Sequence, residues 1–241
     1  MSESSPDPRR RLFVFGLTAV VIAAVVIAGI AINRSNNSNM PAASPPVGVA
    51  SPTPSGPPQT SFADCTTVQF GAPLPPLNPP ADVHRYSAAP SPQTDDKKLY
   101  QATITTDKGA IVLCLQPNLA PNTVNNFVAL ARNHFYDGLV FHRVEPDFVI
   151  QGGDPQGTGN GGPGYQCGDE PVRQQYVDGA VAMANSGSNT NGSQFFIDIA
   201  DNTLKLQPSY NLFGKVQSGL DVAHRIAKGD VMRTVTVAQQ Q

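Results

Sequence analysis

Proline divides this chain of 241 residues into parts that cannot fold alike. Fourteen of its 23 prolines fall within residues 33–98, and only seven follow in the 143 residues after that stretch. Proline fixes φ and lacks a backbone N–H, so a segment rich in it cannot supply long helices or central strands. We therefore expect one folded domain, residues 97–241, preceded by a spacer, residues 33–96.

The spacer is rich in proline, serine and alanine, as in SPPVGVASPTPSGPPQT and APLPPLNPPADV. Such a segment buries too little apolar surface to offset its ordering entropy, and it runs extended at about 3.1 Å per residue. One patch differs. SFADCTTVQF, residues 61–70, carries Phe62, Cys65, Val68 and Phe70, which are suited to packing on the folded domain.

A run of 21 uncharged residues, 12–32, precedes the spacer. As a helix it would measure roughly 30 Å, the thickness of the hydrocarbon core of a bilayer. Arg9, Arg10 and Arg11 stand directly before it, so the positive-inside rule leaves residues 1–11 in the cytoplasm and the rest outside. We expect a single-pass protein of the cell membrane. The alternative is a cleaved signal peptide and a free secreted form, although the apolar part of a signal peptide is usually about 7–15 residues long.

From residue 97 the sequence alternates in the manner of β-strands. Two runs, 99–106 and 110–115, are joined by Asp107, Lys108 and Gly109, which is typical of a hairpin. Pro121 opens a helical stripe, and a second helix fits residues 219–226. Further short strands are expected in LVFHRV, DFVIQGGD, GAVAMANSG, SQFFIDIA and RTVTVA. Many short strands with two helices predict a mainly β domain, a closed antiparallel barrel with helical plugs.

The stretch GTGNGG, residues 157–162, matches the dinucleotide fingerprint G-x-G-x-x-G. That fingerprint holds a phosphate only between a strand and a helix. Here Pro155 and Pro163 flank it, and no helical stripe follows. The glycines instead predict a surface loop that turns tightly with positive φ.

Other chemistry has little support. The net charge of −2 argues against nucleic acid as a partner, and the four histidines lack the spacing of a metal site. No cofactor is implied. Cys114 lies in the apolar run IVLCL and reads as a core residue, whereas Cys65 and Cys167 could form a disulfide or remain free thiols.

Three segments, FHRVEPDFVIQGGD, MANSGSNTNGSQFFI and YNLFGKV, closely resemble the signature segments of cyclophilins, the peptidyl-prolyl cis–trans isomerases. The resemblance covers about residues 99–237. It implies a closed eight-stranded antiparallel barrel capped by two helices. It also implies Arg143 as the catalytic arginine, Phe148 as an aromatic of the proline pocket and Gln151 as the glutamine beside it. Residue types alone would favour a buried structural ion pair at Arg143.

The same resemblance implies the residues that bind the substrate. Asn185 would hold the peptide backbone, and Phe196 would be the second pocket aromatic. Ser186 stands where many members have alanine, and Val149 where many have methionine, which shortens that wall. The lip of the pocket is expected to use Leu204 or Leu206 as its leucine and Tyr210 in place of a histidine. The chain has no tryptophan, so we expect only weak binding of cyclosporin.

The implied activity is the rotation of X–Pro peptide bonds in proline-containing peptides and unfolded proteins. With the predicted anchor, its substrates would be exported or cell-envelope proteins. Because no bond to the substrate breaks, the reaction needs no nucleophile, metal or cofactor. The alternative is a module that binds a proline-containing partner with only incidental turnover, but a retained Arg143 favours the enzyme.

Overall fold

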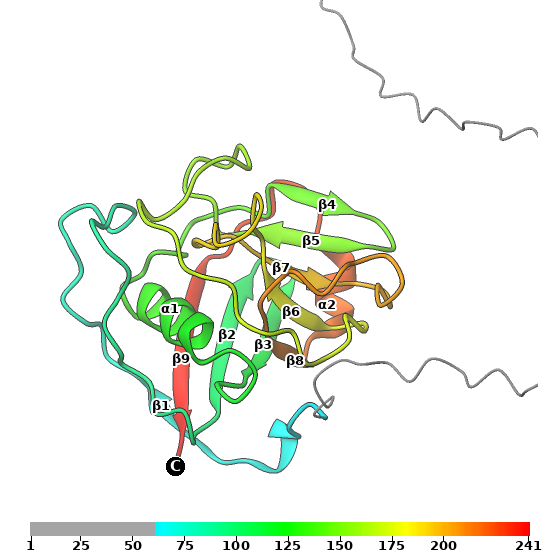
Figure 1. Cartoon of the computed structure of the whole chain (residues 1–241), viewed down its shortest axis with the longest axis horizontal. Helices are drawn as coiled ribbons and strands as arrows, with labels where there is room; N and C mark the ends of the chain where they lie inside the picture. The colour runs from blue at the N-terminus through cyan, green and yellow to red at the C-terminus, as the bar shows by residue number, and fades with distance from the viewer. Residues whose placement is uncertain (1–60) are drawn as a thin grey trace, which may run out of the picture. The chain divides into compact units, whose positions relative to one another are not determined.

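The computed structural model describes residues 61–241, which contain nine strands, two α-helices and a short 3₁₀ helix (Figure 1). In chain order these are η1 (Cys65–Thr67), β1 (Phe70–Pro73), β2 (Tyr100–Thr106), β3 (Gly109–Leu115), α1 (Pro121–Arg132), β4 (Arg143–Glu145), β5 (Val149–Gly152), β6 (Ala180–Met183), β7 (Phe195–Asp198), β8 (Leu212–Ser218), α2 (Leu220–Arg225) and β9 (Thr234–Gln240).

The predicted cytoplasmic tail, the membrane anchor and the first part of the spacer, residues 1–60, lie outside the described residues. Within residues 61–241, none of the helices has the length and apolar character needed to cross a bilayer.

All nine strands belong to one antiparallel sheet in the order β1-β9-β2-β3-β8-β6-β7-β5-β4. The prediction of a closed barrel is wrong, because no ladder among the described strands joins β4 to β1 at the other end of the sheet. The segments that lead into β4 and β9 meet only at an isolated bridge between Val140 and Val231. The additional strand β1 pairs with the edge of β9 that a closing strand would need.

The first hairpin is confirmed. Tyr100 on β2 lies opposite Leu115 on β3, and the register continues without interruption to Thr106 and Gly109 at the turn. Gly109 has a φ of 128°, which side chains with a Cβ rarely adopt. The short turn formed by Asp107 and Lys108 therefore depends on this glycine to close the hairpin.

Helix α1 is also confirmed, and its N-terminus is stabilised from elsewhere in the chain. Pro121 occupies the first turn, but Ala120 at the N-cap has no side chain that accepts a hydrogen bond. The carboxylate of Glu170 accepts the backbone N–H groups of Asn122 at 3.0 Å and Thr123 at 2.8 Å. A negative charge at this end also complements the helix dipole.

The sheet has an inner face and an outer face, because side chains alternate along each strand. The inner face and α1 enclose the inner core, which includes Ile104, Ile111, Leu113, Phe127, Ile150, Phe195, Ile197 and Phe213. The outer face carries a second set, the outer cluster, formed by Leu119, Val149, Tyr176, Ala180, Ala182, Phe196 and Leu212. The outer cluster supports the candidate site.

Residues 61–98 form a strap that is attached to the domain along its length, unlike the extended spacer expected for residues 33–96. Strand β1 pairs with β9, and the backbone N–H of Leu74 donates to the carbonyl of Val237 at 2.7 Å. The patch at residues 61–70 packs as its side chains suggest, with Phe62 against the outer cluster. The domain boundary therefore lies earlier than residue 97.

The disulfide is Cys65–Cys114, with the two Cα atoms 6.0 Å apart, so the pairing of Cys65 with Cys167 is wrong. Cys167 has a free thiol. Leu113 and Leu115 face the inner core, so Cys114 between them emerges on the outer face of β3, where the strap passes. The reading of Cys114 as an ordinary core residue missed this alternation.

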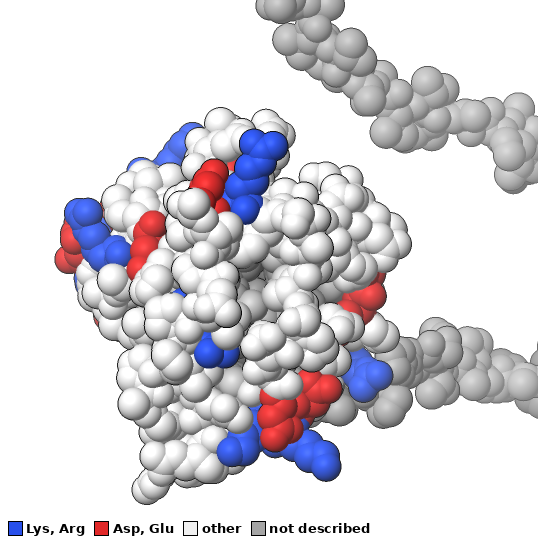
Figure 2. Space-filling model, turned by 90° about the vertical axis from the view of Figure 1, so that its left-hand side faces the viewer, with Lys and Arg blue, Asp and Glu red and all other residues white. Residues whose placement is uncertain are grey.

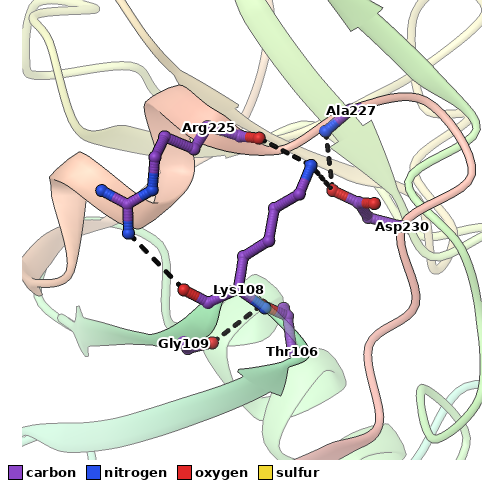
Figure 3. A network of polar contacts seen from close by, with 6 residues as sticks. All are labelled: Thr106, Lys108, Gly109, Arg225, Ala227 and Asp230. Atoms are coloured by element: carbon purple, nitrogen blue, oxygen red, sulfur yellow. Dashed lines mark hydrogen bonds and ion pairs between the residues drawn. The ribbon is translucent and has the colours of Figure 1, made fainter.

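A polar network joins the β2–β3 turn to the segment between α2 and β9 (Figure 3). The ammonium of Lys108 lies 2.6 Å from the carboxylate of Asp230 and donates to the carbonyl of Arg225 at 2.8 Å. The same carboxylate accepts the N–H of Ala227 at 2.7 Å. These contacts hold in place the loop that contains Lys228, a residue in the wall of the candidate site.

Candidate active site

Four neighbouring strands place one residue each in a row across the sheet. Arg143 on β4 lies opposite Gln151 on β5, Gln151 opposite Phe196 on β7, and Phe196 opposite Ala182 on β6. Residues directly opposite one another in antiparallel strands point to the same face. All four side chains therefore share the outer face, and the row brings together three residues that the sequence predicts for one site.

A cavity of about 580 Å³ lies over this row. Most of the predicted site residues line it: Arg143, Phe148, Val149, Gln151, Asn185, Phe196, Leu206 and Tyr210. Its size suits a short peptide segment rather than a single small ion.

Two predicted residues lie outside this first cavity. Ser186 lines a second cavity of about 230 Å³, which shares Gln151 and Asn185 with the first. Leu204 is 99% exposed, so its place in the lip is wrong and Leu206 takes it. The backbone N–H groups of Lys205 and Leu206 both donate to the carbonyl of Asn202. In such a turn, residues two apart point in different directions.

Arg143 lies at the mouth of the first cavity. Its guanidinium carbon is 5.7 Å from the ring centre of Phe148, and Nη1 donates to Oε1 of Gln151 at 3.3 Å. Nε lies 3.6 Å from the carboxylate of Glu145, with 46% of the Arg143 side chain exposed. The alternative of a buried structural ion pair is therefore wrong. The N–H donors of this cation remain accessible from the cavity.

A relay of amide side chains orients Gln151 behind Arg143. Nε2 of Gln151 donates to Oε1 of Gln194 at 3.0 Å. Nε2 of Gln194 in turn donates to the carbonyls of Gly159 at 3.0 Å and Gly161 at 2.8 Å. Because each amide has its donor end occupied, Gln151 presents its oxygen to the guanidinium.

The glycine-rich loop that anchors this relay folds around a carboxylate of its own chain. Asp154 accepts the backbone N–H groups of Gln156 at 2.7 Å, Thr158 at 2.9 Å and Gly159 at 2.6 Å. Burial raises the pKa of Asp154, but these hydrogen bonds outweigh burial and hold the pKa below 3.8.

The loop conformation confirms the reading of GTGNGG. Gly157 and Gly159 have φ values of 66° and 89°, and a Cβ at Gly161 would collide with the Asp154 carboxylate. The glycines thus serve tight turns around an internal anion.

The backbone of Phe148 is held by the segment that follows β7. Its carbonyl accepts the N–H of Ile199 at 2.9 Å and Nδ2 of Asn202 at 2.7 Å. Asn202 also donates to the buried Asp198 carboxyl at 2.6 Å. Burial is the main cause that raises the pKa of Asp198 to about 8, so this acid is largely neutral at pH 7.

The lip opposite Arg143 depends on Tyr210. Its ring meets Phe196 edge to face, with centroids 5.5 Å apart. The Tyr176 hydroxyl donates to the Tyr210 carbonyl at 2.8 Å and accepts its N–H at 3.0 Å. Nδ2 of Asn185 holds the neighbouring Ser209 carbonyl at 2.9 Å. Asn185 thus uses its side chain on the lip, which leaves its backbone for a ligand.

Sequence reasoning missed three charged or titratable residues of the first cavity, His142, Glu145 and Lys228. Neither ring nitrogen of the buried His142 has a hydrogen-bond partner among residues 61–241. Burial lowers the pKa of His142. The Asp154 carboxylate opposes this shift, and the nearby cations Lys228 and Arg143 add to it. The position of His142 beside Arg143 in FHR was a usable signal, whereas nothing local to Lys228 marks it.

The fold and this site define a class of protein, a mainly β domain with one antiparallel sheet, two helices and a peptide-sized cavity on the outer face of the sheet. The family model for cyclophilin type peptidyl-prolyl cis-trans isomerases matches residues 101–240. The chain belongs to this family, and it is a peptidyl-prolyl cis–trans isomerase with a mainly β, cyclophilin-like fold and two helices.

Relatives in sequence and in structure agree. The chain is 49% identical over 133 residues to peptidyl-prolyl cis-trans isomerase B of Bacillus subtilis, covering 54% of this chain and 92% of that protein. It is 44% identical over 142 residues to an isomerase of Helicobacter pylori, covering 57% and 86%. A crystal structure of a cyclophilin type isomerase of Cryptosporidium parvum aligns with a TM-score of 0.54 at 30% identity, covering 58% and 97%. That protein was also crystallised in the presence of the dipeptide Ala-Pro, with a TM-score of 0.53.

Proposed function

We propose that the chain isomerises X–Pro bonds in exported or cell-envelope proteins, with Arg143 as the catalytic residue. The observation that carries the catalytic part is the row of Arg143, Gln151 and Phe196 across three strands, which sets a fixed cation beside an apolar surface. Phe148, Val149, Leu206 and Tyr210 complete the walls that would hold a proline ring.

The chemistry follows from the peptide bond. Resonance makes the C–N bond partly double, with a rotation barrier of about 18–20 kcal/mol. In the twisted transition state the proline nitrogen becomes pyramidal and regains a lone pair. A donor directed at that nitrogen binds the twisted form better than either planar form, which is what lowers the barrier. An arginine is always protonated and offers several N–H donors, and Gln151 keeps one of its nitrogens in place.

The peptide would be held by groups around this donor. The backbone of Asn185 would pair with the substrate, and the second cavity beside it would take residues next to the X–Pro unit. Phe148 and Phe196 offer aromatic faces to the ring. With Tyr210 at the lip and no tryptophan in the chain, we expect cyclosporin to bind only weakly.

The substitution Arg143→Ala tests the catalytic role. We expect turnover of a short Ala-Pro peptide, measured by NMR exchange spectroscopy, to fall about 10²–10³-fold, as for loss of other transition-state donors. Arg233→Ala is the matched control, because Arg233 is an exposed arginine paired with Asp107 on the surface. Near-normal turnover by a folded Arg143→Ala variant would remove Arg143 from the mechanism.

Two observations support the extracytoplasmic placement. Disulfides persist in oxidising compartments, and Cys65 is bonded to Cys114. The sequence pattern of three arginines before residues 12–32 orients the rest of the chain outward. N-terminal sequencing of the membrane fraction from cells with the full chain should find Met1 or Ser2. A soluble form that begins after residue 32 would instead favour secretion.

A further inference from the structure

The strap, residues 61–98, precedes the region that the family model matches, residues 101–240. It runs along the side of the domain at the left of Figure 1, the side that faces the viewer in Figure 2. The side chains of α1 hold it at both ends. Nε of Arg132 donates to the carbonyl of Pro75 at 2.8 Å, and Oδ1 of Asn125 accepts the N–H of Gln93 at 2.6 Å.

Between these attachments the strap contacts the segment that follows the glycine-rich loop. The backbone N–H of Tyr86 donates to the carbonyl of Pro163 at 2.8 Å. The Tyr86 ring meets Tyr165 edge to face at 6.4 Å and also packs on Phe135 at 6.3 Å. The approach is so close that a Cβ at Gly164 would collide with the Tyr86 carbonyl oxygen.

The segment that Tyr86 contacts forms part of the wall of the second cavity. Pro163, Tyr165 and Gly192 all line that cavity. The Tyr165 hydroxyl donates to Oδ1 of Asn126 at 2.6 Å, and Nδ2 of Asn126 donates to the Gly192 carbonyl at 2.8 Å. Asn126 of α1 thus links Tyr165 to Gly192, and Tyr86 contacts the Pro163–Tyr165 segment from the strap.

The second cavity is lined mainly by glycines and uncharged polar residues, and it shares Gln151, Gly159, Ala184 and Asn185 with the first. A loop with four glycines among residues 157–162 has little intrinsic rigidity. Its free end therefore depends on an outside support to keep one conformation. Asp154 supplies that support at the start of the loop, and the strap supplies it at the end.

We propose that the strap, through Tyr86, is a positioning element for the second cavity. It sets the affinity for peptides long enough to occupy that cavity, and it leaves the isomerisation step in the first cavity unchanged. This inference rests on the proposed use of the first cavity for the X–Pro unit. The peptides favoured are those with small or uncharged polar side chains next to that unit, because the lining carries no charged residue.

The substitution Gly164→Ala tests the contact within the whole chain, since its new Cβ must push the strap and the wall apart. Gly138→Ala is the matched control. Both glycines have positive φ, 98° and 80°, but a Cβ at Gly138 meets no atom within 4 Å. Tyr86→Leu is a milder second variant, which keeps the backbone hydrogen bond and removes the ring contacts.

Two peptides distinguish an effect on the second cavity from an effect on the first. One is a blocked Ala-Pro dipeptide, and the other is the same unit extended by three uncharged residues at each end. Titration by NMR gives Kd, and exchange spectroscopy gives turnover. For Gly164→Ala we expect at least a fivefold higher Kd for the long peptide only, with turnover at saturation within twofold of wild type. Tyr86→Leu should act in the same direction by a smaller factor, and Gly138→Ala should change neither peptide.

Equal weakening of both peptides, or an unchanged Kd for the long peptide in both folded variants, would overturn the positioning role. A fall in turnover at saturation would overturn it too, because the strap would then act on the first cavity. If wild type binds both peptides without accelerating exchange, the proposed catalytic function fails, while the Kd comparison still decides the role of the strap.

Discussion

The inner and outer faces of the sheet are built from the same strands but follow different rules. On β5 and β7 the inward residues Ile150, Phe195 and Ile197 are apolar and fully buried. Their outward neighbours Gln151 and Phe196 line a cavity, and Asp198 is a buried acid. A shift of one residue along a strand thus changes a packing position into a site position.

This difference separates stability from function. The inner core is one continuous, mostly apolar set that also includes residues of α1, so its members stabilise the fold mainly by burial. The outer face is divided among the first cavity, the disulfide at Cys114 and the Asp198–Asn202 pair, each with a polar or covalent component. Such a face tolerates exposure because the inner core already supports the sheet.

The adjacent pair Phe195 and Phe196 gives the strongest test of this comparison. Phe195→Ala should lower the free energy of unfolding by about 3–5 kcal/mol, because it leaves a cavity in the inner core. Phe196→Ala should destabilise the fold less and weaken binding of an Ala-Pro peptide about tenfold, or about 1.4 kcal/mol. Urea unfolding and peptide titration measure the two effects. Equal stability losses with unchanged peptide affinity would refute the division between the faces.

The disulfide tests whether the outer face of β3 needs its covering strap. The double substitution of Cys65 and Cys114 by alanine should lower the free energy of unfolding by about 2–4 kcal/mol, since the bond closes a loop between residues 49 positions apart. Cys167→Ala is the control, because that thiol is free. Turnover on a dipeptide should stay within twofold. A double variant as stable as the control would mean that noncovalent contacts alone hold the strap.

Local patterns were sufficient for much of the fold. The β2–β3 hairpin and α1 were predicted because their alternation, turn residues and opening proline lie within a few positions of one another. The row of Arg143, Gln151 and Phe196 came from the resemblance to a family, since no local pattern says that β4, β5 and β7 are neighbours.

The misses share a nonlocal cause. Strand β1 has only four residues, one of them Pro73, and its pairing partner β9 stands at the other end of the domain. The choice between Cys114 and Cys167 as the partner of Cys65 depends on where the strap crosses the sheet. Leu204 and Leu206 could not be separated because the turn around Asn202 decides which one faces the cavity.

Asp198 offers the finest test, because its effect depends on pH. Burial raises its pKa from 3.8 to about 8 in the folded protein. Between these values the folded state retains a proton that the unfolded state has lost, so the stability from neutral Asp198 is complete below pH 3.8 and falls as pH rises toward 8. Asp198→Asn should remove this pH dependence. The free energy of unfolding of the variant, relative to that of wild type, should therefore be higher at pH 9 than at pH 5 by more than about 1 kcal/mol. Asp96→Asn, at an exposed acid that is not among the groups that shift the Asp198 pKa, should leave the slope unchanged. A wild-type slope that survives Asp198→Asn would place the titrating group elsewhere, and the outer face at β7 would then carry no neutral acid.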